Sequence, residues 1–201
     1  ALLMEKPGRL LVGTEGGGVV LFDRQKGEFT PLALRDTVGT GIATSVVSSL
    51  LIDRAKDLWI GTTSGLYWRD AKTGRVRVYD ADRGLTLPIV RGILQDEQGN
   101  LWISVSGGLI RFALRKHPAQ SDRNSVDQLP IVNLYDLKDG LQGNEFTRGA
   151  CVVALDGKMY FGGQRGLNVF LPDDINRHMR IPPVQITDLQ LFNMSVLPGD
   201  K

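Results

Sequence analysis

The sequence predicts an all-β fold, namely a partial β-propeller of about four four-stranded antiparallel blades. Four segments share one pattern, in which an apolar pair is followed by small residues, a glycine and alternating apolar residues. The equivalent points Gly13, Gly61, Ser104 and Gly162 lie 48, 43 and 58 residues apart, which is the period of a propeller blade. No segment carries a sustained helical period of apolar residues.

The second unit shows how a blade divides into strands. Short apolar or alternating runs are separated by the turn sequences DRAKD, TTSG and DAKTG, whose glycines and aspartates suit tight turns. The expected strands, from the inside of the blade outwards, are residues 45–52, 58–61, 66–69 and 76–79. The third unit repeats this division with strands at residues 89–95, 101–104 and 109–112.

A large side chain recurs at one position of the repeat. Trp59, Trp102 and Tyr160 are equivalent, and Leu11 takes this place in the first unit. A flat ring there can fill the gap between successive sheets. A stacking platform for bases or sugars is the alternative, but recurrence in every unit favours packing.

The amino-acid composition excludes few functions, but it limits the partners and the environment that we expect for the chain. The 24 lysines and arginines against 22 aspartates and glutamates give a net charge of +2 without a basic block, so no nucleic-acid partner is expected. Cys151 lies in an apolar run, which predicts a buried, inert thiol. The chain opens at Ala1 and begins and ends in apparently structured sequence, so we expect a piece of a larger protein.

The segments LWIGTTSGLYWRD, from Leu58, and DEQGNLWIS, from Asp96, resemble the repeat of the two-component regulator propeller family. Residues 140–175 resemble the closing blade of that family, and residues 181–193 are similar to the opening of the Tyr-Tyr-Tyr domain, a small β-sandwich. The chain departs from the family pattern at Ser104, where glycine is usual, and in an irregular stretch at residues 115–129. The expected organisation is propeller blades over residues 1–180, roughly 1–40, 41–84, 85–140 and 141–180, and then the first strand of a truncated sandwich in residues 181–201.

This resemblance implies the sensor region of a membrane-bound bacterial receptor. It would be the periplasmic portion of an inner-membrane protein whose cytoplasmic output is a histidine kinase, often a hybrid one. A small-molecule or saccharide ligand and a second receptor copy, in a homodimer, are the expected partners, and membrane contact is expected only through segments outside this chain. A diguanylate cyclase output and a purely structural or dimerising propeller stay open as alternatives.

No catalytic residue, metal site or cofactor is predicted in this chain, so the chain itself is not expected to be an enzyme. Its two histidines, His117 and His178, lie outside the blade motifs, which disfavours a propeller lyase. Asp53, Asp96 and Asp156 precede the second strands of their units. There they are better suited to cap turn amides than to bind a metal.

Polar residues near the starts of the inner strands are the candidates for ligand binding. In a propeller these strands line the channel, and the loops that feed them meet the turns between second and third strands on one face. The candidates are Thr44, Ser45, Arg91, Asn144, Glu145 and Arg148 near these starts and Arg165 in a facing turn, with Glu15 and Thr63 in the other facing turns. Such a mixture could bind a small polar ligand through bidentate hydrogen bonds, although ordinary solvation explains each residue alone. The proline-flanked linker at residues 172–183 is expected to act as a semi-rigid joint.

Overall fold

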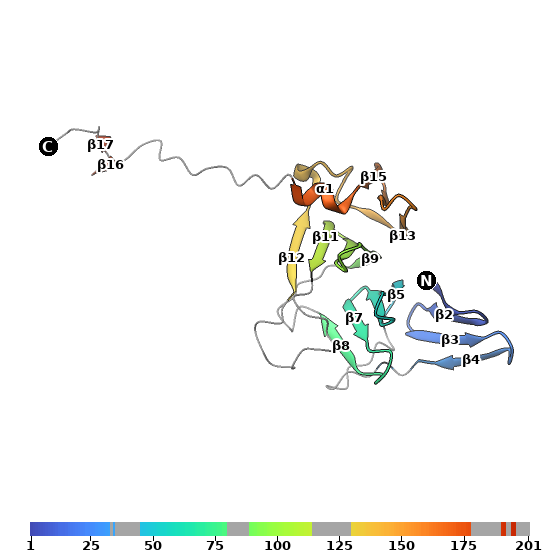
Figure 1. Ribbon diagram of the computed structural model, residues 1–201. Helices are drawn as coiled ribbons and strands as arrows, with labels where there is room; N and C mark the ends of the chain where they lie inside the picture. The colour runs from blue at the N-terminus through green and yellow to red at the C-terminus, as the bar shows by residue number, and fades with distance from the viewer. Residues whose placement is uncertain are drawn as a thin grey trace.

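Three four-stranded sheets and one three-stranded sheet are arranged as a fan around a common centre (Figure 1). The computed structural model describes residues 1–32, 34, 45–79, 89–113, 130–177, 190–191 and 194–195. Blade 1 consists of β1 (Leu2–Lys6), β2 (Arg9–Gly13), β3 (Val19–Asp23) and β4 (Glu28–Pro31). Blade 2 consists of β5 (Val47–Ile52), β6 (Leu58–Thr62), β7 (Gly65–Arg69) and β8 (Val76–Tyr79). Blade 3 consists of β9 (Val90–Gln95), β10 (Leu101–Val105), β11 (Gly108–Ala113) and β12 (Ile131–Tyr135). Blade 4 consists of β13 (Phe146–Val153), β14 (Met159–Gly163) and β15 (Gly166–Phe170).

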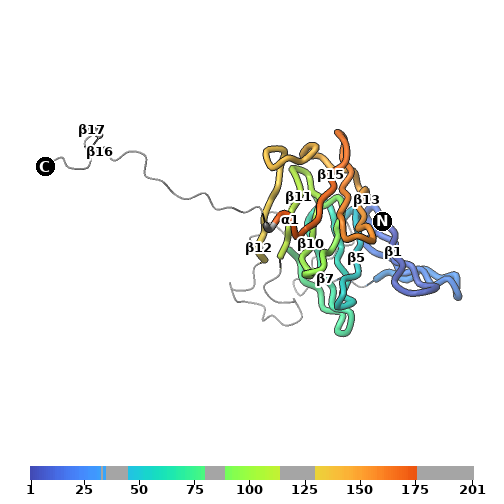
Figure 2. The backbone as a smooth tube through the Cα atoms, turned by 45° about the horizontal axis from the view of Figure 1, so that its top comes forward, coloured from blue at the N-terminus to red at the C-terminus, as the bar shows by residue number. Residues whose placement is uncertain are grey.

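Each blade is an antiparallel meander in which neighbours along the chain pair with each other. Figure 2 shows the inner strands β1, β5 and β13 close together at the centre of the fan. A 3-10 helix, Leu137–Asp139, precedes blade 4, and helix α1, Pro172–Arg177, follows β15. Two short strands, β16 (Gln190–Leu191) and β17 (Met194–Ser195), pair with each other near the end of the chain. In the described residues no helix combines the length and the apolar character that crossing a bilayer requires.

The all-β prediction is confirmed, and the predicted strands of the second and third units lie within two residues of those observed. The sequence analysis did not predict β12, the 3-10 helix at Leu137–Asp139 or helix α1. β12 lies beyond the irregular stretch, so that stretch separates the third strand of blade 3 from its outer strand and accounts for the longest repeat spacing. The stretch itself, residues 115–129, lies outside the described residues.

Helix α1 was also not predicted from the sequence. Pro172 opens it, because a proline at the first helical position gives up an amide that has no helical partner there. Asp173 and Asp174 follow in the first turn, where the helix dipole favours negative charge. The expected joint at residues 172–183 is therefore helical in its first half.

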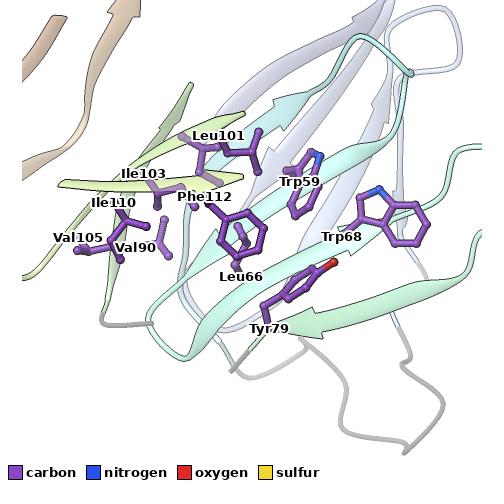
Figure 3. Close-up of a cluster of buried hydrophobic side chains, with 11 residues drawn as sticks. Trp59, Leu66, Trp68, Tyr79, Val90, Leu101, Ile103, Val105, Ile110 and Phe112 are labelled. Atoms are coloured by element: carbon purple, nitrogen blue, oxygen red, sulfur yellow. The ribbon is translucent and has the colours of Figure 1, made fainter. Parts of the chain in front are cut away.

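The core lies between successive sheets, as the recurring aromatic position predicted. Trp59 is fully buried between blades 2 and 3, where its ring stacks on Tyr79 at a centroid distance of 5.9 Å and meets the edge of Phe112 at 6.1 Å (Figure 3). Trp102 repeats this between blades 3 and 4, with Tyr135 at 5.8 Å and Phe170 at 4.9 Å. The packing interpretation is confirmed for Trp59 and Trp102, whereas Tyr160, in the last blade, is only partly buried.

The repeating glycine exists because the next blade comes close to it. A Cβ atom on Gly13 would lie 2.4 Å from Cγ1 of Val47, and one on Gly61 would lie 2.4 Å from Cγ1 of Val90. In blade 3, where Ser104 replaces this glycine, the space is supplied by its cross-strand partner Gly92 instead. A Cβ there would lie 2.6 Å from Sγ of Cys151 in blade 4. The departure from the family pattern at Ser104 is thus compensated on the neighbouring strand.

Candidate functional site

One side of the fan, here called the mouth face, carries the starts of the inner strands and the turns between second and third strands. Backbone hydrogen bonds tie the turns of blades 1 and 3 to the following blade. The amide of Val47 donates to the carbonyl of Thr14 at 2.9 Å, and the amide of Gly107 donates to the carbonyl of Asn144 at 2.9 Å. The mouth face is therefore a continuous surface across blades.

Three consecutive inner strands are bulged where they enter the mouth face. The register shifts between Val47 and Ser49 in β5 and between Val90 and Gly92 in β9, so Ser48 and Arg91 are the extra residues. In β13 the shift is larger and spans the segment between Phe146 and Cys151. Bulges re-aim side chains and occur often beside functional sites, so this shared feature marks the mouth face as the candidate site.

Ser48 and Arg91 occupy equivalent places with different consequences. Ser48 is buried, and its hydroxyl lies 3.0 Å from the carbonyl of Gly61 and 2.6 Å from that of Val90, where it ties blade 2 to blade 3. Arg91 is partly exposed, and among the described residues its side chain makes one long contact, from Nη2 to Oγ of Ser106 at 3.5 Å. Its Nε is buried and has no hydrogen-bond partner in the described part of the chain. The donors that Arg91 retains for a ligand are therefore those at the tip of the guanidinium.

The bulge of β13 connects the first and last blades. Arg148 in this bulge donates from Nη1 to Oε1 of Glu15 in the turn between β2 and β3, at 2.6 Å. Gly149 permits the sharp bend with φ of 71°. The ion pair is exposed, with 41% of the Arg148 side chain and 73% of the Glu15 side chain accessible, so solvent or a ligand can compete for it.

Some of the remaining predicted site residues make hydrogen bonds within the protein, and others leave polar groups exposed on the mouth face. The Ser45 hydroxyl lies 2.8 Å from that of Ser64, which leaves two hydroxyls together on the mouth face. The side-chain oxygen of Asn144 accepts from the amide of Leu137 at 2.9 Å, a contact that fixes the entry to blade 4. Glu145 and Arg165 are exposed on the same face, and the amide of Arg165 donates to the side chain of Gln142 at 2.9 Å. Thr44 lies outside the described residues.

The sequence analysis missed several mouth-face residues that the structure adds, namely Ser48, Ser64, Ser106 and Gln142. The sequence did contain a pattern that could have identified Ser48. Ser48 and Arg91 each stand 13 residues before the repeat position held by Gly61 and Ser104, so aligning the units would have paired them. The others lie in turns, where repeat spacing alone does not say which side chains meet.

The turn aspartates are structural. Asp53 accepts from the indole of Trp59 at 2.9 Å, and Asp96 accepts from the indole of Trp102 at 3.0 Å, while both also accept backbone amides of their turns. Asp156 is not equivalent to them, because the matching turn position in blade 4 is Ala154. Within the described part of the chain, no three histidine, cysteine, aspartate or glutamate side chains gather closely enough to hold a metal ion.

The opposite side of the fan carries an open cleft of about 330 Å³ between the turns after β5 and β9. Arg54 and Gln95 line it and are joined there, since the Arg54 amide donates to the Gln95 side chain at 3.0 Å. Gln98 also lines the cleft and donates to the Asp173 carboxylate of α1 at 2.6 Å. This contact holds the exit helix against blade 3.

The Cys151 thiol gives a prediction on pH. Burial raises its pKa from 9.0 to about 11, so the folded protein keeps the thiol protonated where the unfolded chain loses the proton. The protonated Cys151 thiol therefore makes its full contribution to the free energy of unfolding below about pH 9, and this contribution is lost between about pH 9 and 11. In urea unfolding across that window, the wild type should lose more stability than Cys151→Ala does. Identical pH dependence of the two proteins would contradict the buried-thiol account.

The comparisons with known proteins agree with this fold. Residues 41–64 and 84–107 match the model of the two component regulator propeller family. The chain is 27% identical to histidine kinase P4 of Formosa agariphila over an alignment that covers 94% of the chain and 16% of the relative. It therefore spans a small part of that protein.

Solved structures show the same architecture at low identity. Crystal structures of the extracellular domains of two proteins of B. thetaiotaomicron, provisionally named hybrid two component systems, match with TM-scores of 0.61 and 0.53 at 18% identity. The matches cover 84% and 100% of this chain, and 20% and 32% of those chains. A provisionally named gluconolactonase matches at a TM-score of 0.58 and 15% identity, over 86% of this chain and 60% of its own, so the fold alone does not select a function. The chain thus has a β-propeller fold, and two of its segments match the two-component regulator propeller repeat.

Proposed function

We propose that this chain is part of the extracytoplasmic sensor region of a membrane-bound bacterial receptor, and that a small polar ligand binds at its mouth face. The observation that carries the proposal is the alignment of 94% of the chain with part of a protein named as a histidine kinase. The repeat matches and the fold shared with extracellular domains support it. We place the receptor in the inner membrane with this region in the periplasm, and a histidine kinase as its output.

The segment after the propeller completes the proposed receptor. Residues 181–201 would begin a Tyr-Tyr-Tyr β-sandwich that leads to the membrane, and two receptors would pair as a homodimer. Most of this segment lies outside the described residues, so the boundary at residue 180 rests on the sequence resemblance. The sandwich would receive the signal from α1.

β9 offers a direct route from the mouth face to α1. Arg91 stands at its start, and Gln98, which holds Asp173, lies in the turn after its end. A six-residue strand such as β9 spans roughly 20 Å and is stiffened by pairing on one side and by inter-blade contacts on the other. A ligand would change the output only if it binds one arrangement of this route better than another.

If β9 carries the signal to α1, a change at the α1 end of this route should alter the output of the receptor without altering ligand binding. A ligand is first found by screening sugars, sugar acids and amino acids for a rise in Tm of the chain, since a bound ligand stabilises the folded state. In the full-length protein, Gln98→Ala should leave the Kd of that ligand within about twofold, because the residue lies away from the mouth face. It should reduce the ligand-dependent change in autophosphorylation by about two- to tenfold, the value of one hydrogen bond.

Glu97→Ala is the matched control for Gln98→Ala. It lies in the same turn and contributes its backbone carbonyl, which accepts from Arg54, so alanine preserves that contact. An unchanged response in Gln98→Ala would exclude α1 as the relay. If no compound in the screen stabilises the chain or alters autophosphorylation, the sensor proposal itself is contradicted.

A structural module is the second candidate, and exposed apolar faces favour it. Leu2, Met4 and Phe29 of blade 1 are 70%, 61% and 65% exposed, and Val152 and Val169 of blade 4 are 58% and 47% exposed. Equivalent faces of blades 2 and 3 are buried by their neighbours. These end faces suit contact with further propeller blades or with another subunit. A symmetric dimer through them, with an inert mouth face, would favour this function over sensing.

A further inference from the structure

We propose that the ligand of the mouth face carries a carboxylate, which replaces Glu15 as the partner of Arg148 and is also held by Arg91. The inference rests on the proposed sensor function and names the class of ligand. Three observations carry it: the position of Arg148, the unused donors of Arg91 and the closeness of the two bulges.

Arg148 already binds a carboxylate in the free protein. Its guanidinium holds Glu15 across 133 residues of sequence, from blade 4 to blade 1, at 2.6 Å. Exposed ion pairs of this kind contribute roughly 0–1 kcal/mol, so another carboxylate of matching geometry can displace Glu15. Displacement would free the turn of blade 1 from the bulge of blade 4, which gives the ligand a structural effect.

Arg91 supplies a second cation with spare donors. The guanidinium has five N–H groups. Among the described residues it makes one hydrogen bond, from Nη2 to Oγ of Ser106 at 3.5 Å. A planar guanidinium and a carboxylate can form two parallel hydrogen bonds, which makes arginine suited to this recognition.

The two arginines lie on neighbouring inner strands. Gly92, the residue after Arg91, is packed against Cys151, so close that a Cβ on the glycine would lie 2.6 Å from the sulfur. Arg148 stands three residues before Cys151, so each arginine lies in the bulged segment of its inner strand, next to the mouth face. The Ser45, Ser64 and Ser106 hydroxyls on the same face suit a ligand that also carries hydroxyl or amine groups.

Isothermal titration of the full 201-residue chain with matched pairs of compounds tests the inference. The pairs are glucuronate with glucose and glutamate with glutamine, which differ within each pair by one carboxylate and separate sugar acids from amino acids as the source. At least one anionic member should bind about tenfold or more tightly than its neutral partner, the value of a charge-assisted hydrogen bond. Its affinity should fall as salt is raised.

Three variants locate the effect. Glu15→Gln should raise the affinity for the anionic compound severalfold, because the internal competitor is removed. Arg91→Gln and Arg148→Gln should each lower it by about tenfold or more. Arg24→Gln is the matched control, since it removes an exposed arginine in the turn after β3, on the opposite side of the fan.

The outcomes separate this inference from the proposed function. Equal affinity for both members of each pair, or no binding of either anion by Glu15→Gln, overturns the carboxylate inference. A neutral compound whose binding depends on Arg91 also overturns it but leaves the sensor proposal standing. If the carboxylate binds as expected while autophosphorylation of the full-length protein ignores it, the site stands and the sensor proposal fails.

Discussion

Replacing Trp102 with alanine is expected to lower the free energy of unfolding by about 3–5 kcal/mol, the usual cost of emptying a large aromatic site in a core. The side chain is fully buried between blades 3 and 4, and it contacts Tyr135 and Phe170. Its loss also removes a hydrogen bond to the buried Asp96. Urea unfolding monitored by circular dichroism measures the change.

Trp102→Phe separates the ring from its hydrogen bond. It keeps most of the packing and loses only the indole donor, while Asp96 retains the amide and the side chain of Asn100 at 2.8 and 2.9 Å. We expect a cost of about 1–3 kcal/mol for this variant. A loss below about 1 kcal/mol in Trp102→Ala would show that blades 3 and 4 do not pack through this residue.

Gly61→Ala is expected to destabilise the protein by about 1–3 kcal/mol, because the added methyl group would overpack the contact between blades 2 and 3. Its Cβ would lie 2.4 Å from Cγ1 of Val90 and 3.1 Å from Cδ1 of Ile93. Combining it with Val90→Ala should restore part of the loss, with a coupling of about 1 kcal/mol in a double-mutant cycle. Additive effects would mean that the two blades are spaced more widely.

Gly143→Ala is the matched control for Gly61→Ala. This glycine is also buried, but its new Cβ would meet nothing closer than Cδ of Arg165 at 3.7 Å, an ordinary contact distance. We expect a change within about 0.5 kcal/mol. A large loss in this control would show that the assay responds to any buried glycine.

The repeat predicted the blades well because each sheet has its own local signals. Alternating apolar residues, turn glycines and the recurring tryptophans specify strands without knowledge of distant partners. β12 was not predicted because the irregular stretch separates it along the chain from its partner strand β11. Asp53 and Asp96 were correctly assigned to turns, but their bonds to Trp59 and Trp102 depend on side-chain direction, which the repeat spacing does not contain.

The site was less accessible to sequence reasoning, since it is assembled from different blades. The pair between Glu15 and Arg148 joins the first and fourth units, and the bulge that creates it has no equivalent of the same size in the other blades. The side-chain oxygen of Asn144 accepts the amide of Leu137, a contact that the repeat did not predict, while the residue stays exposed. Ligand contact for the other predicted residues stays a prediction.

The most direct test of the account is a crystal structure of the full-length extracytoplasmic region, prepared with the compound that raises its Tm. We predict density for that compound at the mouth face, in contact with Arg91 and Arg148 and with the Glu15 pair broken. Density on the opposite side of the fan, or a mouth face covered by another part of the protein, would contradict the account.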